Sequence, residues 1–429
     1  RMSIRLASGG ILETTVTWAE TEQAIQKALC TRASFGPAKS ATHIGDGNGF
    51  LSKVAVINPD WQGQEKERDS LLPSPFVLKM ASCLKAASME KKQAETGSEH
   101  FDPFDEQKWA VFEGFIKKLH NYEAAFYEFS RPWASDILIP HNFYTTRFSE
   151  TNPAAGAIAM EHLKGSIKHL HHTMSNQNAK QIARQLGKIQ ALALRHKIVE
   201  KVPEIAKRDA HAEFWSNFNL PMAEGMLQLL KQFKEGDQRM QKAVDAAVNI
   251  LPEYFGGNLA STLHIQLGIT PVIVNGDLWS GNVIFDEETD EIVSLIDWQL
   301  VHVGCGVEDL IRITLAGLSA EDRRASVDEL LEEMHRGLVE NLNGEKLPFT
   351  LQELKDTYEL LFPHCVMFFV PVIANVSQVN APGISDEEKA KRMAIVSDKA
   401  LGLLEDLLVY HERNLENDRK LCWKTAGAA

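Results

Sequence analysis

The spacing of apolar and polar positions divides the chain into a strand-rich first third and a helix-rich remainder. Residues 17–30 repeat apolar positions at helical spacing, with Thr17 as a cap, and residues 104–130 show the same periodicity. Between these helices, residues 40–58 indicate two strands around a glycine turn, and PFVLKMAS at 75–82 indicates a further strand. The first third therefore predicts a small, mostly antiparallel sheet with helices.

The remainder of the chain continues this division. Residues 58–75 and 84–100 are polar and rich in turn formers, which indicates surface loops, whereas ILIPHNFYTTRF and AGAIAMEHL are strand-like. After residue 163 the pattern is helical except for two short strands around a loop in residues 271–299. This order predicts an α+β chain with a small lobe over residues 1–162 and a large helical lobe over residues 163–429.

Composition and charge narrow the class of protein. The 429 residues are 44% hydrophobic and 24% charged, which is typical of a globular chain that can fill two cores. The net charge of −13 leaves no basic footprint for nucleic acid or for an anionic membrane. No apolar run approaches a membrane span, and the most apolar stretch, at 361–376, predicts a core helix. The five cysteines lack metal-ligand spacing, so we expect reduced thiols and a cytoplasmic location.

The strongest chemical pattern is NGDLWSGN at 275–282, followed by Asp297. An apolar strand leads into a loop in which Asp277 precedes Asn282 by five positions, and a second apolar strand ends at Asp297. A kinase-like phosphotransferase uses such an aspartate to orient the attacking hydroxyl and to accept its proton. Amide and carboxylate oxygens such as those of Asn282 and Asp297 are the ligands that Mg²⁺ prefers. Single Asn and Asp residues are also common in turns, but the joint spacing favours catalysis.

A second pattern, GNGFLSKV at 47–54, contains Gly47, Gly49 and Ser52. It follows the kinase glycine-loop template G-x-G-x-x-G-x-V with Ser52 in place of the third glycine. Paired glycines let backbone N–H groups approach a phosphate closely, so these residues are predicted to bind nucleotide. A hairpin turn would give the same pattern.

Two charged residues predict an anchor for the phosphates of ATP. Lys79 lies within the apolar run FVLKM, where a charge needs a partner, and Glu123 on a predicted helix can supply it. Such a lysine–glutamate pair holds the α- and β-phosphates in kinases. An edge-strand lysine and a solvated glutamate are the alternatives. Further on, Glu161 and Leu163 flank the junction of the two lobes, where either a hinge with backbone groups for adenine or a simple linker is expected.

These segments resemble the aminoglycoside-phosphotransferase and choline-kinase group, in particular its CHK kinase-like branch with the uncharacterised nematode kinase-like proteins and the insect ecdysteroid kinases. The likeness covers nearly the whole chain and includes HNYEAAFYEF, NGDLWSGNVIF and LIDWQLVHVGCGVEDLIRI. It implies a protein-kinase-like two-lobed fold, with Asp277 catalytic, Asn282 and Asp297 binding metal, and the lysine–glutamate pair anchoring phosphates. It also implies a structural role for Asp309 beside the catalytic loop, for which a helix N-cap is the simpler interpretation.

The chain departs from that group in two places. Asn275 stands where the family has a histidine two positions before the catalytic aspartate, and that histidine braces the loop, so the change bears on the rigidity of the loop. The polar loop at 58–75 is longer than the segment that an ordinary kinase has between its glycine loop and its lysine.

Three functions fit these observations: a small-molecule kinase, a protein kinase and a catalytically inactive nucleotide-binding or interaction module. Only a short stretch separates Asp297 from Glu308, without D-F-G or A-P-E, so an activation loop that binds a peptide has no room. Asn275 favours the inactive module, but the catalytic and metal-binding positions keep competent side chains. We expect an ATP- and Mg²⁺-dependent kinase acting on the hydroxyl of a small molecule; no motif specifies this acceptor or an oligomeric state.

Two further groups of residues admit both a functional and a simpler interpretation. His169, His171 and His172 could suggest a metal site, but neighbouring histidines do not share one face, and a polar loop is expected. Trp279 and Trp298 flank the predicted catalytic residues and could contact a quaternary ammonium group, although packing is the commoner use of such residues.

Overall fold

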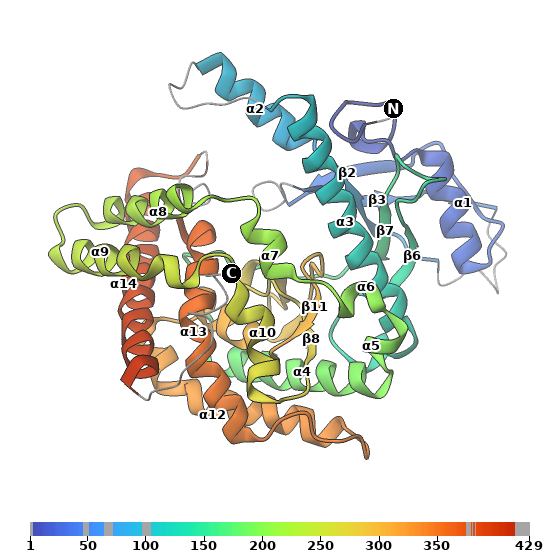
Figure 1. The fold of residues 1–429 in the computed structure, drawn as a ribbon. Coiled ribbons are helices and arrows are strands. Elements are labelled where there is room, and N and C mark those ends of the chain that lie inside the picture. Colours follow the sequence, from blue (N-terminus) through green and yellow to red (C-terminus); the bar gives the residue numbers. More distant parts are fainter. Residues whose placement is uncertain are drawn as a thin grey trace. The chain divides into compact units, whose positions relative to one another are not determined.

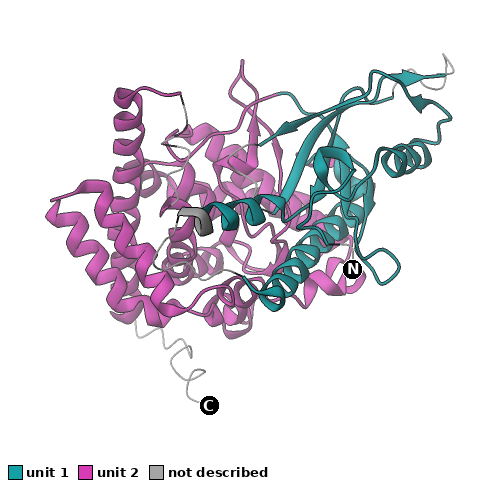
Figure 2. Ribbon diagram, turned by 90° about the horizontal axis from the view of Figure 1, so that it is seen from above, with its two compact units in different colours: residues 1–135, 139–164 teal, residues 136–138, 165–429 magenta. Residues whose placement is uncertain are grey.

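The structure is a computed structural model that describes residues 3–45, 51–63, 72–96, 104–374, 379, 381 and 383–416. The chain forms two compact units, coloured separately in Figure 2. Unit 1 contains residues 1–135 and 139–164, and unit 2 contains residues 136–138 and 165–429. The expected boundary after residue 162 lies two residues before the end of unit 1.

Unit 1 is built on a five-stranded antiparallel sheet in the order β2-β3-β5-β7-β6 (Figure 1). Its elements are η1 (Ile11–Glu13), α1 (Trp18–Leu29), β1 (Ser34–Phe35), β2 (Ser40–Ile44), β3 (Ser52–Asn58), β4 (Trp61–Gln62), β5 (Phe76–Ala81), α2 (Leu84–Thr96), α3 (Glu106–Ser130), η2 (Arg131–Asp136), which reaches the boundary, β6 (Asn142–Thr146) and β7 (Ala157–Glu161). Helix α1 begins after Thr17, whose side chain forms a capping box with Glu20. The cap predicted from the sequence is therefore confirmed.

The alternation of side chains along β5 decides which residues enter the core of unit 1. Phe76, Leu78 and Met80 are buried in one apolar cluster that also contains Ile25 of α1. Because successive strand residues point to opposite faces, Lys79 is directed to the other side of the sheet. The sequence of this strand thus delivers one charged group to the face opposite the apolar cluster.

The prediction of a surface loop over residues 84–100 is wrong, because Leu84–Thr96 form helix α2. Its sequence, LKAASMEKKQAET, consists mostly of residues with high helix propensity. Few of its positions are apolar, so it lacks the apolar stripe from which the other helices were predicted. Helix α2 could therefore have been predicted from the intrinsic helix propensity of its residues, but not from hydrophobic periodicity.

Unit 2 consists of helices and two small two-stranded antiparallel sheets, β8 with β11 and β9 with β10. Its elements are α4 (Asn176–Arg195), α5 (Ile198–Lys201), α6 (Pro203–Ala206), α7 (Ala210–Trp215), α8 (Leu220–Leu229), η3 (Leu230–Lys234), α9 (Gln238–Tyr254), α10 (Asn258–Leu267), β8 (Val272–Val274), η4 (Ser280–Asn282), β9 (Val283–Phe285), β10 (Ile292–Leu295), β11 (His302–Gly304), α11 (Glu308–Gly317), α12 (Ala320–Asn341), α13 (Leu351–Ala374) and α14 (Asp386–Glu416). Strands β8 and β10 are the apolar strands expected before Asp277 and Asp297. Strands β9 and β11 were not expected. The predicted α+β architecture, with a small antiparallel sheet and a large helical part, is confirmed.

Helix α13 is the one helix in the described part of the chain that is long and apolar enough to cross a membrane by length and composition. The expectation that no run reaches this length is therefore corrected. However, 78% of its most apolar window is buried within the structure, and Phe362 and Phe369 are completely buried. The helix thus has the burial of a core helix, as the stretch at 361–376 predicted.

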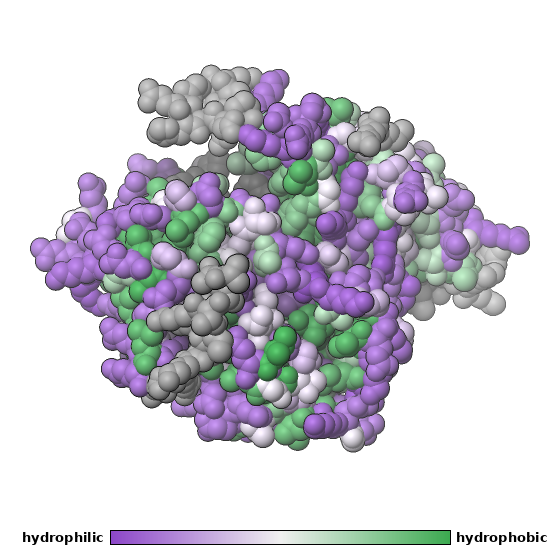
Figure 3. Space-filling model, viewed as in Figure 1, coloured by the Kyte–Doolittle hydropathy of each residue, from purple (hydrophilic) through white to green (hydrophobic). Residues whose placement is uncertain are grey.

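The exposed apolar residues are distributed over several elements. On the face shown in Figure 3, hydrophilic residues cover most of the area and hydrophobic residues lie between them. Among the described residues, the large apolar side chains with the greatest exposure are Val111 on α3 and Ile265 on α10, each 69% exposed. Isolated exposure of this kind is normal for a folded protein.

Candidate active site

The ion pair expected in unit 1 is present. Lys79 Nζ on β5 lies 2.7 Å from Glu123 Oε2 on α3, and the two side chains are only 8% and 2% exposed. The pair forms because β5 directs its single charge away from the apolar cluster and Glu123 lies on the buried side of α3. A buried pair of this kind holds the ammonium group at a fixed position. Its role in binding phosphates remains a prediction.

The other residues of unit 1 predicted to bind nucleotide are Gly47, Gly49, Ser52, Glu161 and Leu163. The two glycines lie outside the described residues. Ser52 is the first residue of β3, and Glu161 is the last residue of β7. The Glu161 carboxylate accepts a backbone N–H within unit 1 at 2.6 Å, and Leu163 is half-buried. The role of these residues in binding adenine stays a prediction.

In unit 2, the loop that carries Asp277 is held by the carboxylate of Asp309. Asp309 is buried in the first turn of α11 and accepts the backbone N–H groups of Asn275 at 2.7 Å and Gly276 at 2.9 Å. Burial raises the pKa of Asp309 to about 7, against the effect of these two N–H groups. The interpretation of Asp309 as an N-cap is wrong, because Val307 occupies that position and Asp309 bonds to a different segment.

Asn275 braces the loop in place of the family histidine. Its side-chain oxygen accepts the backbone N–H of Asp277 at 3.0 Å, and its Nδ2 donates to the backbone oxygen of Asp297 at 3.0 Å. Asn275 is completely buried, so both contacts are shielded from water. These bonds connect the loop that carries Asp277 with the segment that carries Asp297.

Gly276 explains how the loop can approach residues 300–302 so closely. Its φ angle is +83°, and an added Cβ would lie 2.4 Å from the backbone oxygen of Leu300 and 3.1 Å from His302 Nδ1. A side chain at this position would therefore clash and would also strain the backbone. The loop before Asp277 consequently lies directly against residues 300–302.

The two predicted metal ligands are linked through their backbones. Ile296 N–H donates to the backbone oxygen of Asn282 at 2.9 Å, and Asn282 Nδ2 donates to the backbone oxygen of Asp277 at 2.8 Å. Asp297 itself has a φ of +60°, a conformation that is uncommon for a residue other than glycine. The structure thus brings residues 277, 282 and 297 into one hydrogen-bonded assembly.

Arg312 belongs to this site and was missed by the sequence analysis. Its guanidinium lies 2.6 Å from Asp277 Oδ1, and its side chain is 4% exposed against 19% for Asp277. It stands one turn after Asp309 on α11, and its guanidinium also lies over the ring of Phe368 at 4.7 Å from the centroid. Arg312 is the single charged residue in the apolar run LIRITLAG. The same pattern, one charge in an apolar run, identified Lys79, so it could have identified Arg312 as well.

Of the residue groups that admitted two interpretations, the two tryptophans are buried. Trp298 is 1% exposed and Trp279 is 9% exposed, with the Trp279 ring beside Gly281, which fits the packing interpretation. The histidine run lies in a loop, as expected, with His171 buried and His172 exposed. Lys399 ties this run to the helical unit, since its Nζ donates to the backbone oxygens of residues 170, 172 and 316.

The antiparallel unit with its buried lysine–glutamate pair and the helical unit with its braced Asp–Asn–Asp assembly have the features that the sequence led us to expect of a kinase-like fold. The chain belongs to the DUF1679 family, described as "Uncharacterized oxidoreductase dhs-27", which it matches over residues 4–415. It is also 35% identical over 97 residues to an uncharacterized kinase-like protein of Caenorhabditis elegans, D1044.1. That match covers 23% of this chain and 25% of the relative, so it spans about a quarter of the relative's length. The resemblance to the nematode kinase-like proteins is confirmed.

Several solved structures are similar to the chain over most of its length. A choline kinase from Cryptosporidium parvum is 10% identical, with a TM-score of 0.46 and coverage of 92% of this chain and 97% of that one. A microcompartment-associated aminopropanol kinase is 13% identical, with a TM-score of 0.39 and coverage of 92% and 98%. A Plasmodium vivax ethanolamine kinase is 11% identical, with a TM-score of 0.37 and coverage of 84% and 82%. None of these three reaches a TM-score of 0.5, and they leave the substrate undetermined.

Proposed function

We propose that this protein is an ATP- and Mg²⁺-dependent phosphotransferase that acts in the cytoplasm on the hydroxyl of a small molecule. The observation that carries the proposal is the assembly around Asp277. A loop residue that ends an apolar strand is held by two buried polar side chains, Asn275 and Asp309, while its own carboxylate remains partly exposed. Such fixed placement is what phosphoryl transfer requires of a protein.

The oxygen donors of unit 2 fit a magnesium ion. Because Asn282 Nδ2 donates to a backbone oxygen, the amide is oriented so that Oδ1 is the atom left for a cation. The carboxylate of Asp297 would supply the second protein ligand, and both are hard oxygen donors. When bound, Mg²⁺ would bridge the phosphates of ATP and neutralise the charge that develops during transfer.

The predicted site residues have different proposed roles in phosphoryl transfer. Arg312 donates to Oδ1 of Asp277, and Asn282 Nδ2 donates to its Oδ2 at 3.4 Å, so both side chains position the carboxylate that is proposed to accept the proton of the attacking hydroxyl. In unit 1, the Lys79 ammonium would bind phosphate oxygens, and Glu123 would keep it in position. The nucleotide-binding role of Gly47, Gly49 and Ser52 is part of the same proposal.

A small molecule is favoured over a peptide because of the segment that connects Asp297 to α11. The ten residues between Asp297 and Glu308 contain β11 and its connections, and β11 pairs with β8 directly before the catalytic loop. This segment is therefore committed to the sheet and offers no extended loop on which a peptide could lie. A hydroxylated metabolite needs no such platform.

The family description names an oxidoreductase, and this alternative has less support. A nicotinamide-binding domain of the common kind requires a parallel sheet with a glycine-rich turn at the end of its first strand. All strand pairings within the part of the chain that the structure describes are antiparallel. A catalytically inactive nucleotide-binding module remains the second candidate, and a measurement of phosphate transfer separates it from the enzyme.

The test is incubation of the protein with labelled ATP, Mg²⁺ and a metabolite extract, followed by mass spectrometry for phosphorylated products. The proposal expects a product with the wild-type protein and with Asp328→Asn, a control carboxylate on α12 that is 77% exposed. It expects Asp277→Asn to form the product at least about 100-fold more slowly. Binding of ATP without transfer in the wild type would favour the inactive module, and equal turnover in Asp277→Asn would refute the role of Asp277.

A further inference from the structure

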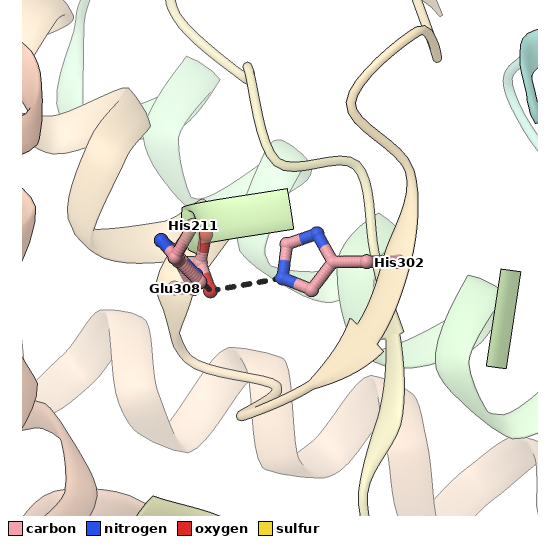
Figure 4. Close-up of side chains that lie close together, drawn as sticks. All are labelled: His211, His302 and Glu308. Atoms are coloured by element: carbon pink, nitrogen blue, oxygen red, sulfur yellow. Dashed lines mark hydrogen bonds and ion pairs between the residues drawn. The ribbon is translucent and has the colours of Figure 1, made fainter. Parts of the chain in front are cut away.

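A second cluster of potential ligands lies in unit 2, separate from the predicted magnesium ligands. It consists of His211 on α7, His302 on β11 and Glu308 at the start of α11, and each residue is 3% exposed. Figure 4 shows the His302 ring directed at the carboxylate of Glu308, with His211 beside it. The Glu308 Oε2 atom lies 3.0 Å from His211 Nε2 and 3.2 Å from His302 Nε2. The three ligand atoms therefore converge from three elements of the chain.

The second nitrogen of each ring has the partner that a metal-binding histidine needs. His302 Nδ1 lies 2.9 Å from the backbone oxygen of Leu300, to which it can donate a proton. This leaves the lone pair of His302 Nε2 directed at the centre of the cluster. His211 Nδ1 lies 3.2 Å from His364 Nε2, which can accept its proton in the same way. Metal-binding histidines almost always donate their other N–H to a carbonyl or similar acceptor, which fixes the tautomer.

The spacing of the ligand atoms also fits a small divalent ion. Ligands at the usual zinc distances around a tetrahedral centre are roughly 3.3 Å apart. The two contacts of Glu308 Oε2 are close to this value. An ion between the three groups satisfies all of them with neutral histidines.

A cavity adjoins the cluster and supplies a route for an ion and a place for a further ligand. It has a volume of about 220 Å³, and His211, His302 and His264 are among the residues that line it. The Nδ1 atom of His264 is buried without a hydrogen-bond partner. A buried polar atom of this kind calls for an ion, a water molecule or another ligand.

We propose that His211, His302 and Glu308 form a binding site for a divalent transition-metal ion of the zinc class. The position of Glu308 in the chain indicates a structural role for this ion. Glu308 is followed directly by Asp309, which holds the backbone of the Asp277 loop, and Gly276 of that loop lies against residues 300–302. An ion that joins α7, β11 and α11 fixes the two segments on which the loop depends.

The test measures metal content and does not depend on phosphoryl transfer. The full chain is stripped with a chelator and titrated with Co²⁺, whose visible absorption reports nitrogen and oxygen ligands in a four- or five-coordinate site. The expected result is one ion per chain, displaced by Zn²⁺. His302→Gln and Glu308→Gln should lose at least about 100-fold in cobalt affinity, since even outer partners of a ligand account for 10- to 100-fold. His335→Gln, on α12, should bind as the wild type does.

Three results would overturn the proposal. The first is a wild-type protein that takes up no stoichiometric ion from Co²⁺ or Zn²⁺. The second is unchanged affinity in both cluster variants. The third is an intense thiolate-to-cobalt absorption band, which would place the ion on a cysteine. Circular dichroism checks the fold of the variants, and if they do not fold the wild-type titration decides alone. Because no step uses ATP, failure here leaves the proposed kinase activity untouched.

Discussion

The two units hold their chemical residues in different ways. In unit 1, Lys79 and Glu123 lie inside regular elements, so the register of β5 and the course of α3 set the position of the ion pair. In unit 2, Asp277 lies in a loop whose backbone is held by the side chains of Asn275 and Asp309. Regular structure fixes its backbone through its own ladder of hydrogen bonds, whereas this loop is held by side chains that bond to its backbone. The effects of mutation should therefore spread further in unit 2 than in unit 1.

The largest effect is expected when the side chain at the centre of the unit 2 assembly is changed. Asp277→Asn keeps the size of the group and an oxygen for Arg312, but it removes the base. Phosphate transfer should fall about 10²- to 10⁴-fold, the usual contribution of a positioned acid or base. The measurement is the transfer rate from labelled ATP, with Asp328→Asn as the exposed control. A rate within a factor of two of the wild type would contradict the proposal.

In unit 1, substitution of Lys79 tests whether Lys79 and Glu123 stabilise the fold only as a pair. Lys79→Met leaves the Glu123 carboxylate buried without its cation and should lower the free energy of unfolding by about 3–5 kcal/mol. The double variant Lys79→Met/Glu123→Leu removes both charges and should recover most of this loss, although not the binding of ATP. Urea denaturation measures both effects. Equal destabilisation in the single and double variants would show that the two residues do not act as a pair.

Acid should weaken unit 1 through His120, which lies one turn before Glu123 on α3. Burial lowers the pKa of His120 to about 4 from its usual 6.5, and its Nε2 contacts the backbone oxygen of Thr146. Between these two pH values the unfolded chain binds a proton that the folded chain does not, so stability rises with pH across this window. The loss on going from pH 6.5 to 4 should approach about 3 kcal/mol.

His120→Gln provides the control for the acid effect, because glutamine can also donate to the Thr146 oxygen and does not titrate. Unfolding in urea at several pH values should give a shallower slope for this variant between pH 4 and 6.5. Identical slopes in the two proteins would assign the acid sensitivity to other groups.

The smallest of these effects is expected for the brace of the catalytic loop. Asn275→Ala removes two buried side-chain hydrogen bonds and should cost about 1–3 kcal/mol of stability. Because the same bonds connect Asp277 with the backbone of Asp297, the transfer rate should fall as well. The control is Asn217→Ala, at an exposed helix end, which should change neither quantity measurably. A stable but fully active Asn275→Ala protein would show that the loop needs no brace.

The sequence predicted what depends on local pattern and on a single buried charge. Local sequence was sufficient to predict the strand that contains Lys79, the helix cap at Thr17 and the position of Asp277 after an apolar strand. Each of these features is encoded within a few residues. The pair with Glu123 could be predicted because a lysine in an apolar strand requires a partner.

The remainder depends on contacts between distant segments. Arg312 and Asp277 are 35 positions apart in the sequence, and His211 and Glu308 are 97 positions apart. Neither contact could therefore be predicted from a local spacing of residues. Helix α2 was missed because a polar helix shows no apolar stripe. The N-cap interpretation of Asp309 failed because a local rule was applied to a residue that serves a segment 34 positions away.

The most direct test of the central claim is calorimetric titration of ATP into the protein with Mg²⁺ present and with Mg²⁺ omitted. If Asn282 and Asp297 hold the ion, the wild-type protein should bind ATP at least about 10-fold more tightly with Mg²⁺, and Asp297→Asn should lose this dependence while Asp328→Asn keeps it. Binding by Asp297→Asn that depends on Mg²⁺ as in the wild type, or a wild-type protein that binds no ATP, would contradict the account.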